Sequence, residues 1–446
     1  MKVNRKKLLH ALNVSAAITS SGGKSFAWPF EGYVLLDGPN QEFSATNLTT
    51  FAKVFLEMTE IKDGFVPEYP EPGLLDGLKI AQMKGLAEDY GIAIPDNGNK
   101  LTANIIKETI LDACNKAAEA DKEKFEGQRL CLYGPTLKRI LEAMTDEYVS
   151  ISQTPNTEGV SVANVGENFN NLSVFDWKEY PVSQIWGEPE LTEAPESKVQ
   201  IHVQDLASVA SACDRDNGKL DAISFDLEST RAIGTDGRIL ITAPIEVLKQ
   251  DPQHPTFLMP KGLLGIIQAM VKEKSKEEKT IQVSYFHNEK GSDVISIKEG
   301  DVSIQANQSG RNFPDWKSVV YAPEKIVTIR KEKLKDILRQ ISAISGPKYR
   351  SIKTKFNGGL DIEFLNPDIG TYQKMSIPFE EKDYQDAEEV EVGLDITLIQ
   401  KAFMACSSHP DNANISIGLK DKAHPLIFDY QGANNFAALV MPLRIV

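Results

Sequence analysis

The spacing of apolar residues along the chain predicts alternating helices and short strands. In the last third, apolar residues at the spacing of one helical face predict a helix over 331–345. Apolar and polar residues then alternate at 360–364 and 415–419, as expected for strands with one buried face. A second helix is predicted between these strands, over 396–406. The last third therefore reads as a unit of two helices and several strands.

The middle third repeats this plan, and so does the first. The predicted elements are helices over 203–212 and 261–272 with strands at 223–227, 281–285 and 302–304 in the middle third, and helices over 6–18 and 136–144 with strands at 33–36, 42–45 and 149–152 in the first. Such a repeat predicts an α+β protein made of three similar units of about 120 to 130 residues, in which two helices pack on antiparallel sheets.

One segment does not fit the repeat. It covers 64–128, opens with a proline-rich linker, and contains two helical patterns at 78–90 and 101–118. A second proline-containing linker covers 187–197. The sequence therefore predicts four parts, which are a discontinuous first domain (1–63 with 129–187), a helical insertion (64–128), a second domain (198–322) and a third domain (323–446).

Composition and charge narrow the functional classes. The chain of 446 residues has 49 Lys and Arg against 63 Asp and Glu, a net charge of −14, which argues against a basic coat but leaves room for a local basic face. Its four cysteines stand singly, which favours a reducing compartment, so we expect a cytoplasmic protein. No apolar run is long enough for a membrane span. Polar residues break the amino-terminal apolar stretch, and its apolar residues fall at the spacing of one helical face, which favours a helix of the mature fold over a signal peptide.

Catalytic motifs are not found. The six histidines are far apart, without the spacing of a zinc site, and neither a nucleophile elbow nor a dinucleotide fingerprint occurs. Gly23-Lys24-Ser25 resembles the end of a phosphate-binding loop, but Ile18 stands where that motif needs its first glycine. We therefore expect no enzymatic activity, no cofactor and no metal.

Three phrases carry a resemblance to a known family. They are Ala232-Ile-Gly-Thr-Asp-Gly-Arg238, Gly310-Arg-Asn-Phe-Pro-Asp-Trp316 and Val440-Met-Pro-Leu-Arg444. In order and spacing they resemble the bacterial DNA polymerase III beta sliding clamp, and the stretch 13–58 resembles the opening of that family's first domain. The resemblance covers the chain apart from the insertion and implies the DNA clamp fold.

The family implies a function without a reaction of its own. Two copies, each of three similar domains, close head to tail into a ring around duplex DNA, with helices facing the hole and sheets outside. Such a homodimer is a processivity factor that holds double-stranded DNA without sequence preference and tethers a DNA polymerase and the clamp loader through short peptide motifs. Encirclement needs only weak phosphate contacts, so an acidic exterior is compatible with it.

The resemblance also implies a partner-peptide pocket between the second and third domains. Carried over residue by residue, it consists of Leu220, Thr235, Gly237, Arg238, Leu240, Pro323, Val440, Met441, Pro442, Leu443 and Arg444. The alternative is that 440–443 completes an edge strand and packs inward. The family usually has His and then Arg after the TDG turn, whereas this chain has Arg238 and Ile239, so the polar rim of the pocket differs.

Basic residues on helices and loops are the candidates to face DNA, although each one alone is equally well an ordinary solvated charge. They are Lys6, Lys7, Lys24, Lys138, Arg139, Lys261, Lys272, Lys335, Arg339, Lys348, Arg350 and Lys401. For ring closure, we expect Phe169, Leu172 and Val174 to meet a segment near Ala343 and Ile344, residues that would serve as well in a core.

The insertion resembles the small helical module at the amino terminus of transcription termination factor Rho and in SAP-type domains. Seven lysines against ten acids over 74–128 argue against nucleic-acid binding there and favour a partner-docking or structural role. For the whole chain, the alternative function is a clamp-fold adaptor that recruits partners without enclosing DNA. A hydrolase with an unrecognised site is a third reading.

Overall fold

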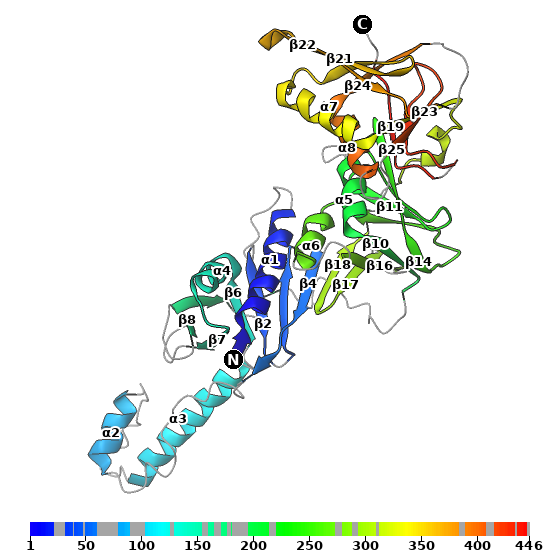
Figure 1. Cartoon of the computed structure of the whole chain (residues 1–446). Helices are drawn as coiled ribbons and strands as arrows, with labels where there is room; N and C mark the ends of the chain where they lie inside the picture. Colours follow the sequence, from blue (N-terminus) through cyan, green and yellow to red (C-terminus); the bar gives the residue numbers. More distant parts are fainter. Residues whose placement is uncertain are drawn as a thin grey trace. The chain divides into compact units, whose positions relative to one another are not determined.

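The chain forms two compact units, Met1–Glu188 and Pro189–Val446 (Figure 1). The computed structural model describes residues 1–21, 32–38, 40–47, 50–59, 79–89, 103–124, 129–153, 159–164, 171–175, 180, 195–213, 220–272, 279–287, 293–308, 312–382, 389–406, 414–432 and 435–443.

The first unit contains one module of two helices and nine strands, with two further helices in the predicted insertion. In chain order it comprises β1 (Lys2–Asn4), α1 (Arg5–Ser21), β2 (Tyr33–Asp37), β3 (Glu42–Thr46), β4 (Thr50–Phe55), β5 (Met58–Thr59), α2 (Ile80–Asp89), α3 (Ala103–Lys124), β6 (Arg129–Tyr133), α4 (Gly134–Ala143), β7 (Tyr148–Gln153), β8 (Gly159–Asn164) and β9 (Asn171–Phe175). The strands pair antiparallel in the orders β6-β2-β3-β4 and β5-β1-β7-β8-β9. We term this the first module.

The second unit contains two further modules. The second module comprises β10 (Ser197–His202), α5 (Val203–Ala212), β11 (Ala222–Asp226), β12 (Arg231–Thr235), β13 (Ile239–Pro244), β14 (Glu246–Lys249), β15 (Thr256–Pro260), α6 (Leu263–Met270), β16 (Thr280–Phe286), β17 (Val294–Glu299) and β18 (Val302–Asn307). The third module comprises β19 (Lys325–Arg330), α7 (Lys331–Ile344), β20 (Ser351–Phe356), β21 (Gly359–Asn366), β22 (Thr371–Pro378), β23 (Glu381–Lys382), β24 (Val390–Asp395), α8 (Ile396–Cys406), β25 (Asn414–Leu419), β26 (Leu426–Phe428) and β27 (Ala438–Val440). A short 3₁₀ helix, Trp316–Val319, lies between them.

The same topology occurs three times in the described residues. Each module runs strand, helix, five strands, helix and three strands. The second module pairs its strands as β15-β11-β12-β13 and β14-β10-β16-β17-β18, and the third as β24-β20-β21-β22 and β23-β19-β25-β26-β27, which matches the first module strand for strand. This is the repeat expected from the sequence, while the domain boundaries themselves stay a prediction.

Local chemistry explains where the helices begin and end. The helices predicted over 203–212 and 396–406 are found at those residues, as α5 and α8. Helix α1 begins at Arg5 because the Asn4 side chain accepts hydrogen bonds from the backbone N–H groups of the next turn. Helix α6 is shorter than predicted, because Gly262 lies at its N-cap instead of inside it.

Apolar side chains from helices and sheets form the cores. The four apolar residues that predicted α7, which are Leu334, Ile337, Leu338 and Ile341, are all buried. In the second module the Phe225 and Phe257 rings stack with their centroids 4.8 Å apart. Burial also raises the pKa of the Cys213 thiol to about 12, so this cysteine behaves as a core residue.

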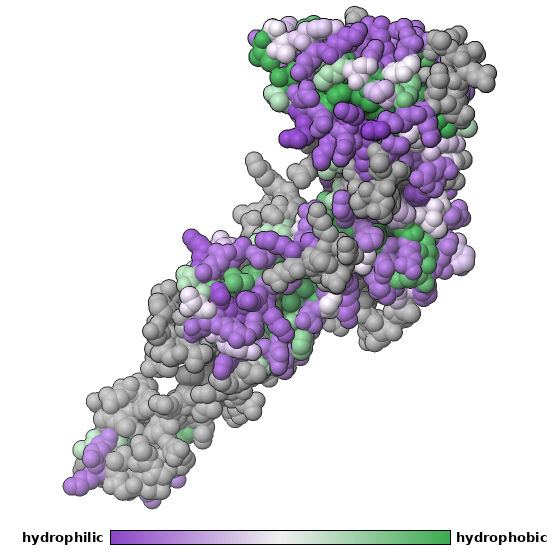
Figure 2. All heavy atoms as spheres, viewed as in Figure 1, coloured by the Kyte–Doolittle hydropathy of each residue, from purple (hydrophilic) through white to green (hydrophobic). Residues whose placement is uncertain are grey.

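Hydrophilic side chains cover most of the visible face of the described residues (Figure 2). Within the described residues, no helix combines the length and the apolar character needed to cross a membrane. The same part of the chain holds no group of three or more His, Cys, Asp or Glu side chains arranged to hold a metal ion.

Candidate partner-peptide and nucleic-acid interfaces

The TDG phrase forms a tight turn that its own side chains hold. It connects β12 to β13 and places Gly237 at a φ of +85°, a conformation that glycine adopts without strain. The Asp236 carboxylate accepts the N–H groups of Arg238 (2.8 Å) and Ile239 (2.9 Å). The Thr235 hydroxyl donates to the Ile239 carbonyl at 2.7 Å and accepts the Gly237 N–H at 3.0 Å. The turn is therefore rigid and presents a fixed surface.

The carboxyl-terminal strand β27 lies beside this turn. It pairs with β13 on one side, with Ile239 opposite Val440, and with β26 on the other. The Met441 N–H then donates to the Arg238 carbonyl at 2.8 Å, and the Leu443 N–H donates to the Gly393 carbonyl at 2.8 Å. Strand β27 is thus an interior strand that joins the second module to the third, and it is not the edge strand considered from the sequence.

The structure brings most of the predicted pocket residues together at this junction. Val440 is fully buried, so it packs inward, whereas Met441 is 37% exposed beside Arg238. Leu240 is buried beneath them, and Pro323 lies against β25, where a Cβ on Gly418 would approach it to 2.9 Å. The remaining predicted residues lie as follows: Thr235 and Leu220 are buried, Gly237 is exposed, Pro442 and Leu443 are half-buried, and Arg444 lies outside the described residues.

An apolar cluster supports this surface from below. It consists of the buried residues Ile233, Leu240, Trp316, Ile427, Phe436 and Leu439, which come from both modules. Phe313, Val320, Tyr321 and Tyr430 pack against it while remaining partly exposed. Sequence reasoning missed these four, because they belong to a linker and loops without a periodic pattern. The available signal in the sequence was position: Phe313 lies within the phrase at 310–316, and Val320 and Tyr321 lie between that phrase and Pro323.

Arg238 gives the junction a charged rim. Its side chain is 65% exposed, and its guanidinium has a long contact of 4.0 Å with the Asp236 carboxylate. Because the backbone of Arg238 is held by Asp236 and Met441, the origin of the side chain is fixed while its cation stays accessible. A partly exposed methionine beside a cation can receive an apolar peptide side chain that carries a neighbouring acceptor.

The basic residues predicted to face DNA differ in their surroundings. Lys6 and Lys7 on α1, Arg139 on α4, and Lys335 and Arg339 on α7 are exposed on helices. Of the others, Lys272, Lys348 and Arg350 are exposed in loops, Lys138 on α4 and Lys401 on α8 are half-buried, and Lys24 lies outside the described residues.

Three of these lysines have specific contacts, and the Lys138 ammonium lies 3.9 Å from the Glu142 carboxylate. The half-buried Lys261 donates its ammonium to the Cys213 carbonyl at the end of α5, so it acts as a helix C-cap. Lys348 contacts Asp368 at 3.4 Å. Lys261 is therefore the member of the set least suited to bind phosphate.

The residues predicted to close a ring lie in two places. Leu172 is buried and Val174 half-buried on β9, whereas Phe169 lies outside the described residues. At the end of α7, Ala343 is exposed and Ile344 half-buried, and the Ile344 carbonyl accepts a hydrogen bond from Asn366 at 2.8 Å.

Among the described strands, β22 is at the edge of its sheet, and it was not among the predicted site elements. Beside its hairpin, Leu365 and Ile369 are each 58% exposed and Tyr372 is 59% exposed. The signal in the sequence was weak, because the apolar residues of β22 at 372, 375 and 377 do not alternate strictly.

The chain is similar to known proteins in structure, although not detectably in sequence. No family model and no curated protein matches the sequence. Among solved structures, the DNA polymerase III beta subunit of Thermotoga maritima is 15% identical with a TM-score of 0.67, and the alignment covers 100% of this chain and 99% of that one. The sliding clamp of Pseudomonas aeruginosa bound to griselimycin is 14% identical with a TM-score of 0.69, over 100% and 99% of the two chains. The Helicobacter pylori beta clamp bound to a DNA ligase peptide is 14% identical with a TM-score of 0.65, over 100% of both.

The alignments extend over the whole chain. The α+β fold predicted from the repeat, and the clamp fold implied by the three phrases, are therefore confirmed. The chain has the fold of the DNA polymerase III beta sliding clamps.

Proposed function

We propose that this protein is a DNA sliding clamp, a homodimeric ring that encircles duplex DNA and tethers replication proteins through a peptide pocket. The observation that carries the proposal is the threefold module repeat with full-length similarity to sliding clamps. The proposal includes the domain boundaries drawn from the sequence, a cytoplasmic location, and the absence of any catalytic step.

Head-to-tail closure is supported by the junction inside the second unit. There, β13 of the second module pairs with β27 of the third, and the chain after β27 bridges to β24 through Leu443 and Gly393. In the first module, β9 is the equivalent of β27. Its residues through Ser173 pair with β8, and Val174 and Phe175 then pair with β6, which is the equivalent of β24. The counterpart of β13 in the third module is β22, so β22 of one copy is suited to pair with β9 of the other.

Two buried acceptors at or next to β22 lack a donor. The side-chain oxygens of Gln373 on β22 and of Asn366 at the end of β21 are buried without a hydrogen-bond donor among the described residues. Buried acceptors without donors are costly, and exposed apolar side chains such as Tyr372 beside them are typical of an interface. Both features support a second copy as the partner of this edge.

The proposed contact with DNA consists of a few weak interactions between exposed cations and phosphates. Each module carries exposed cations on its helices or adjacent loops, while the whole chain carries a net charge of −14. A ring retained by topology needs few phosphate contacts, because many would stop it from sliding. The acidic remainder of the molecule disfavours binding of DNA to its outside.

The junction between β13 and β27 is the proposed docking site for polymerase and clamp-loader peptides. Support comes from the rigid turn, the exposed Met441, and the accessible Arg238 at one rim. The structure of the Helicobacter pylori clamp contains a ligase peptide, which is a partner of the kind proposed here.

Enclosure of DNA is tested by retention on circular and linear DNA. After loading, we expect the protein to stay on a nicked circle and to leave once the circle is cut at one site, because a closed ring slides off free ends. Light scattering should give twice the chain mass of 49.3 kDa. A stable monomer at micromolar concentration that still binds partner peptides would instead establish the clamp-fold adaptor.

A further inference from the structure

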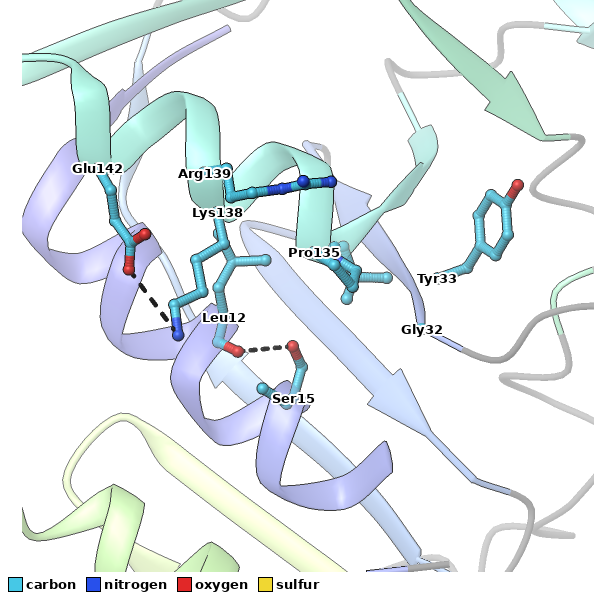
Figure 3. Close-up of a pocket in the computed structure, with 11 residues that line it drawn as sticks. Leu12, Ser15, Gly32, Tyr33, Pro135, Lys138, Arg139 and Glu142 are labelled. Atoms are coloured by element: carbon cyan, nitrogen blue, oxygen red, sulfur yellow. Dashed lines mark hydrogen bonds and ion pairs between the residues drawn. The ribbon is translucent and has the colours of Figure 1, made fainter. Parts of the chain in front are cut away.

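The first module contains a hollow of about 460 Å³ between its two helices (Figure 3). Its walls come from α1, from α4, and from the start of β2 with the glycine before it. The lining residues are Leu12, Ser15, Ala16, Gly32, Tyr33, Val34, Gly134, Pro135, Lys138, Arg139 and Glu142. None of them belongs to the peptide junction of the second unit, so the hollow is a separate feature.

Close backbone packing at two glycines and the apolar side chains around them form the floor of the hollow. The Gly134 N–H donates to the Gly32 carbonyl at 2.8 Å, which brings the start of α4 onto the chain before β2. A Cβ on Gly134 would lie 3.0 Å from that carbonyl oxygen and 3.2 Å from the Val34 side chain. The space on that side of Gly134 is therefore filled by its neighbours, and Leu12, Val34 and Pro135 supply the apolar surface of the floor. The face of a planar ring can pack on such an apolar surface.

The rim of the hollow has donors on one helix. Lys138 and Arg139 are consecutive on α4, and the Lys138 ammonium contacts Glu142 at 3.9 Å, a distance too long for a strong ion pair. The exposed Arg139 guanidinium has a contact of 3.4 Å with the Thr136 hydroxyl. Figure 3 shows both cationic side chains along α4 at the hollow. They leave donors for an anion such as phosphate.

Acceptors lie in the wall and on the rim of the hollow. In the wall, the buried Ser15 hydroxyl donates to the Leu12 carbonyl at 2.9 Å, so its oxygen retains lone pairs that can accept. The Glu142 carboxylate is a further acceptor on α4. A ligand that uses the whole hollow therefore has a planar body, an anion and amino groups.

We propose that this hollow binds a nucleotide, with its base on the floor and its phosphate at Lys138 and Arg139. Its volume lies within the range of small-molecule sites. A fatty acid would leave the acceptors unused, and inorganic phosphate would leave the apolar walls unfilled. The ligand is either a free nucleotide or an unpaired nucleotide of a single strand, which offer the same chemistry.

The inference does not depend on the proposed ring. Every described lining residue belongs to the first module, so a monomeric full-length chain would bind as well. A protein that does not bind nucleotides but is retained normally on circular DNA would overturn the inference and leave the proposed function intact. A protein that binds nucleotides but is not retained on circular DNA would overturn the proposed function and leave the inference intact.

Titration calorimetry on the full-length protein tests the hollow with three probes, which are deoxyadenosine monophosphate, a twelve-residue oligothymidylate and inorganic phosphate. We expect Arg139→Glu to weaken nucleotide binding about tenfold or more, because it replaces a charge-assisted hydrogen bond by repulsion. Ala16→Leu should weaken it similarly by filling the hollow. Lys333→Glu, on the exposed face of α7, and Ala143→Leu, at the end of α4 outside the lining, are the matched controls and should bind like the wild type.

The probes separate the sources of the ligand. Binding of the monophosphate in competition with the oligonucleotide supports a site that accepts a free nucleotide. Binding of the oligonucleotide alone, lost in Arg139→Glu and Ala16→Leu, supports a single strand as the source. Equal binding of inorganic phosphate, no binding of either nucleotide probe, or equal loss in the control variants would overturn the inference.

Discussion

Asp226 shows how one buried charge fixes the linker between the second and third modules. Its carboxylate accepts hydrogen bonds from the Trp316 indole N–H (3.1 Å) and the Ser229 N–H (3.0 Å), and it pairs with the Lys317 ammonium at 3.0 Å. Burial alone would raise the pKa of this carboxyl group. The hydrogen bonds from Ser229 and Lys317 outweigh burial and hold the pKa below its usual value.

The lowered pKa gives a direction for the pH dependence of stability. In the unfolded chain an aspartate has a pKa of about 3.9, so the ionised Asp226 stabilises the fold fully above that pH. This contribution is lost as the pH falls from there through the lower folded pKa. We expect Asp226→Asn to reduce the free energy of unfolding by about 1 to 3 kcal/mol at pH 7 and to flatten its decline in acid. Urea unfolding between pH 7 and pH 3 measures both effects.

Asp315→Asn is the control for that variant. Asp315 is an exposed carboxylate that caps the Lys317 N–H at 3.1 Å. We expect its replacement to cost less than Asp226→Asn and to retain the acid decline. An acid decline that is equally steep in Asp226→Asn and in the wild type would refute the assigned role.

From the sequence alone, the proximity of two residues could be predicted only where a local phrase carries it. The TDG turn and Met441 could be found because their neighbours in sequence carry the signal, and the structure places them together. The contact between Asp226 and Trp316 could not be predicted, because 90 residues separate them and no sequence pattern around either residue indicates the other as its partner. The same applies to Tyr321, whose place at the junction is set by contacts across modules.

At the scale of elements, a glycine sets how closely α5 approaches β12. A Cβ on Gly234 would lie 2.2 Å from the Val209 carbonyl oxygen in α5, which is backbone and cannot rotate away. We expect Gly234→Ala to force helix and sheet apart and to lower the free energy of unfolding by at least about 3 kcal/mol. Chemical denaturation of the full-length protein measures the loss.

Gly265 provides the matched substitution. It lies in α6, and a Cβ there meets nothing within 4 Å. Gly265→Ala should therefore stabilise the protein by about 0.5 to 1 kcal/mol through helix propensity. Equal effects of the two alanines, in either direction, would mean that the close approach at Gly234 does not limit the packing.

Periodicity predicted helices well and strand pairing poorly. The extents of α5 and α8 follow from apolar spacing within a few turns of chain, which is a local property. The pairing of β13 with β27 joins residues about two hundred positions apart, so no window of sequence contains it. The open edge at β22 was missed for the same reason. An edge strand has no neighbouring strand on one side, and no local sequence window shows which strands become neighbours.

At the scale of the whole molecule, the repeat makes the open edge of strand β22 the decisive feature. In a head-to-tail ring, each junction joins one module's counterpart of β13 to the next module's counterpart of β27, and β22 takes part only if a second copy supplies β9. Charge at Tyr372 should then block the ring without affecting the folded chain, because this side chain is 59% exposed.

We therefore expect Tyr372→Asp to convert the dimer into a monomer in light scattering and to abolish retention on circular DNA, with unchanged thermal unfolding of the individual chain. Leu248→Asp is the matched control, since Leu248 is 42% exposed on β14, another strand at the edge of its sheet, and it should remain a dimer. A Tyr372→Asp protein that stays dimeric would show that the copies meet elsewhere. In that case β22 and β13 would still occupy equivalent positions in their modules, because the repeat fixes those positions. The equivalence would not predict the dimer contact, because no second copy would pair with the edge of β22.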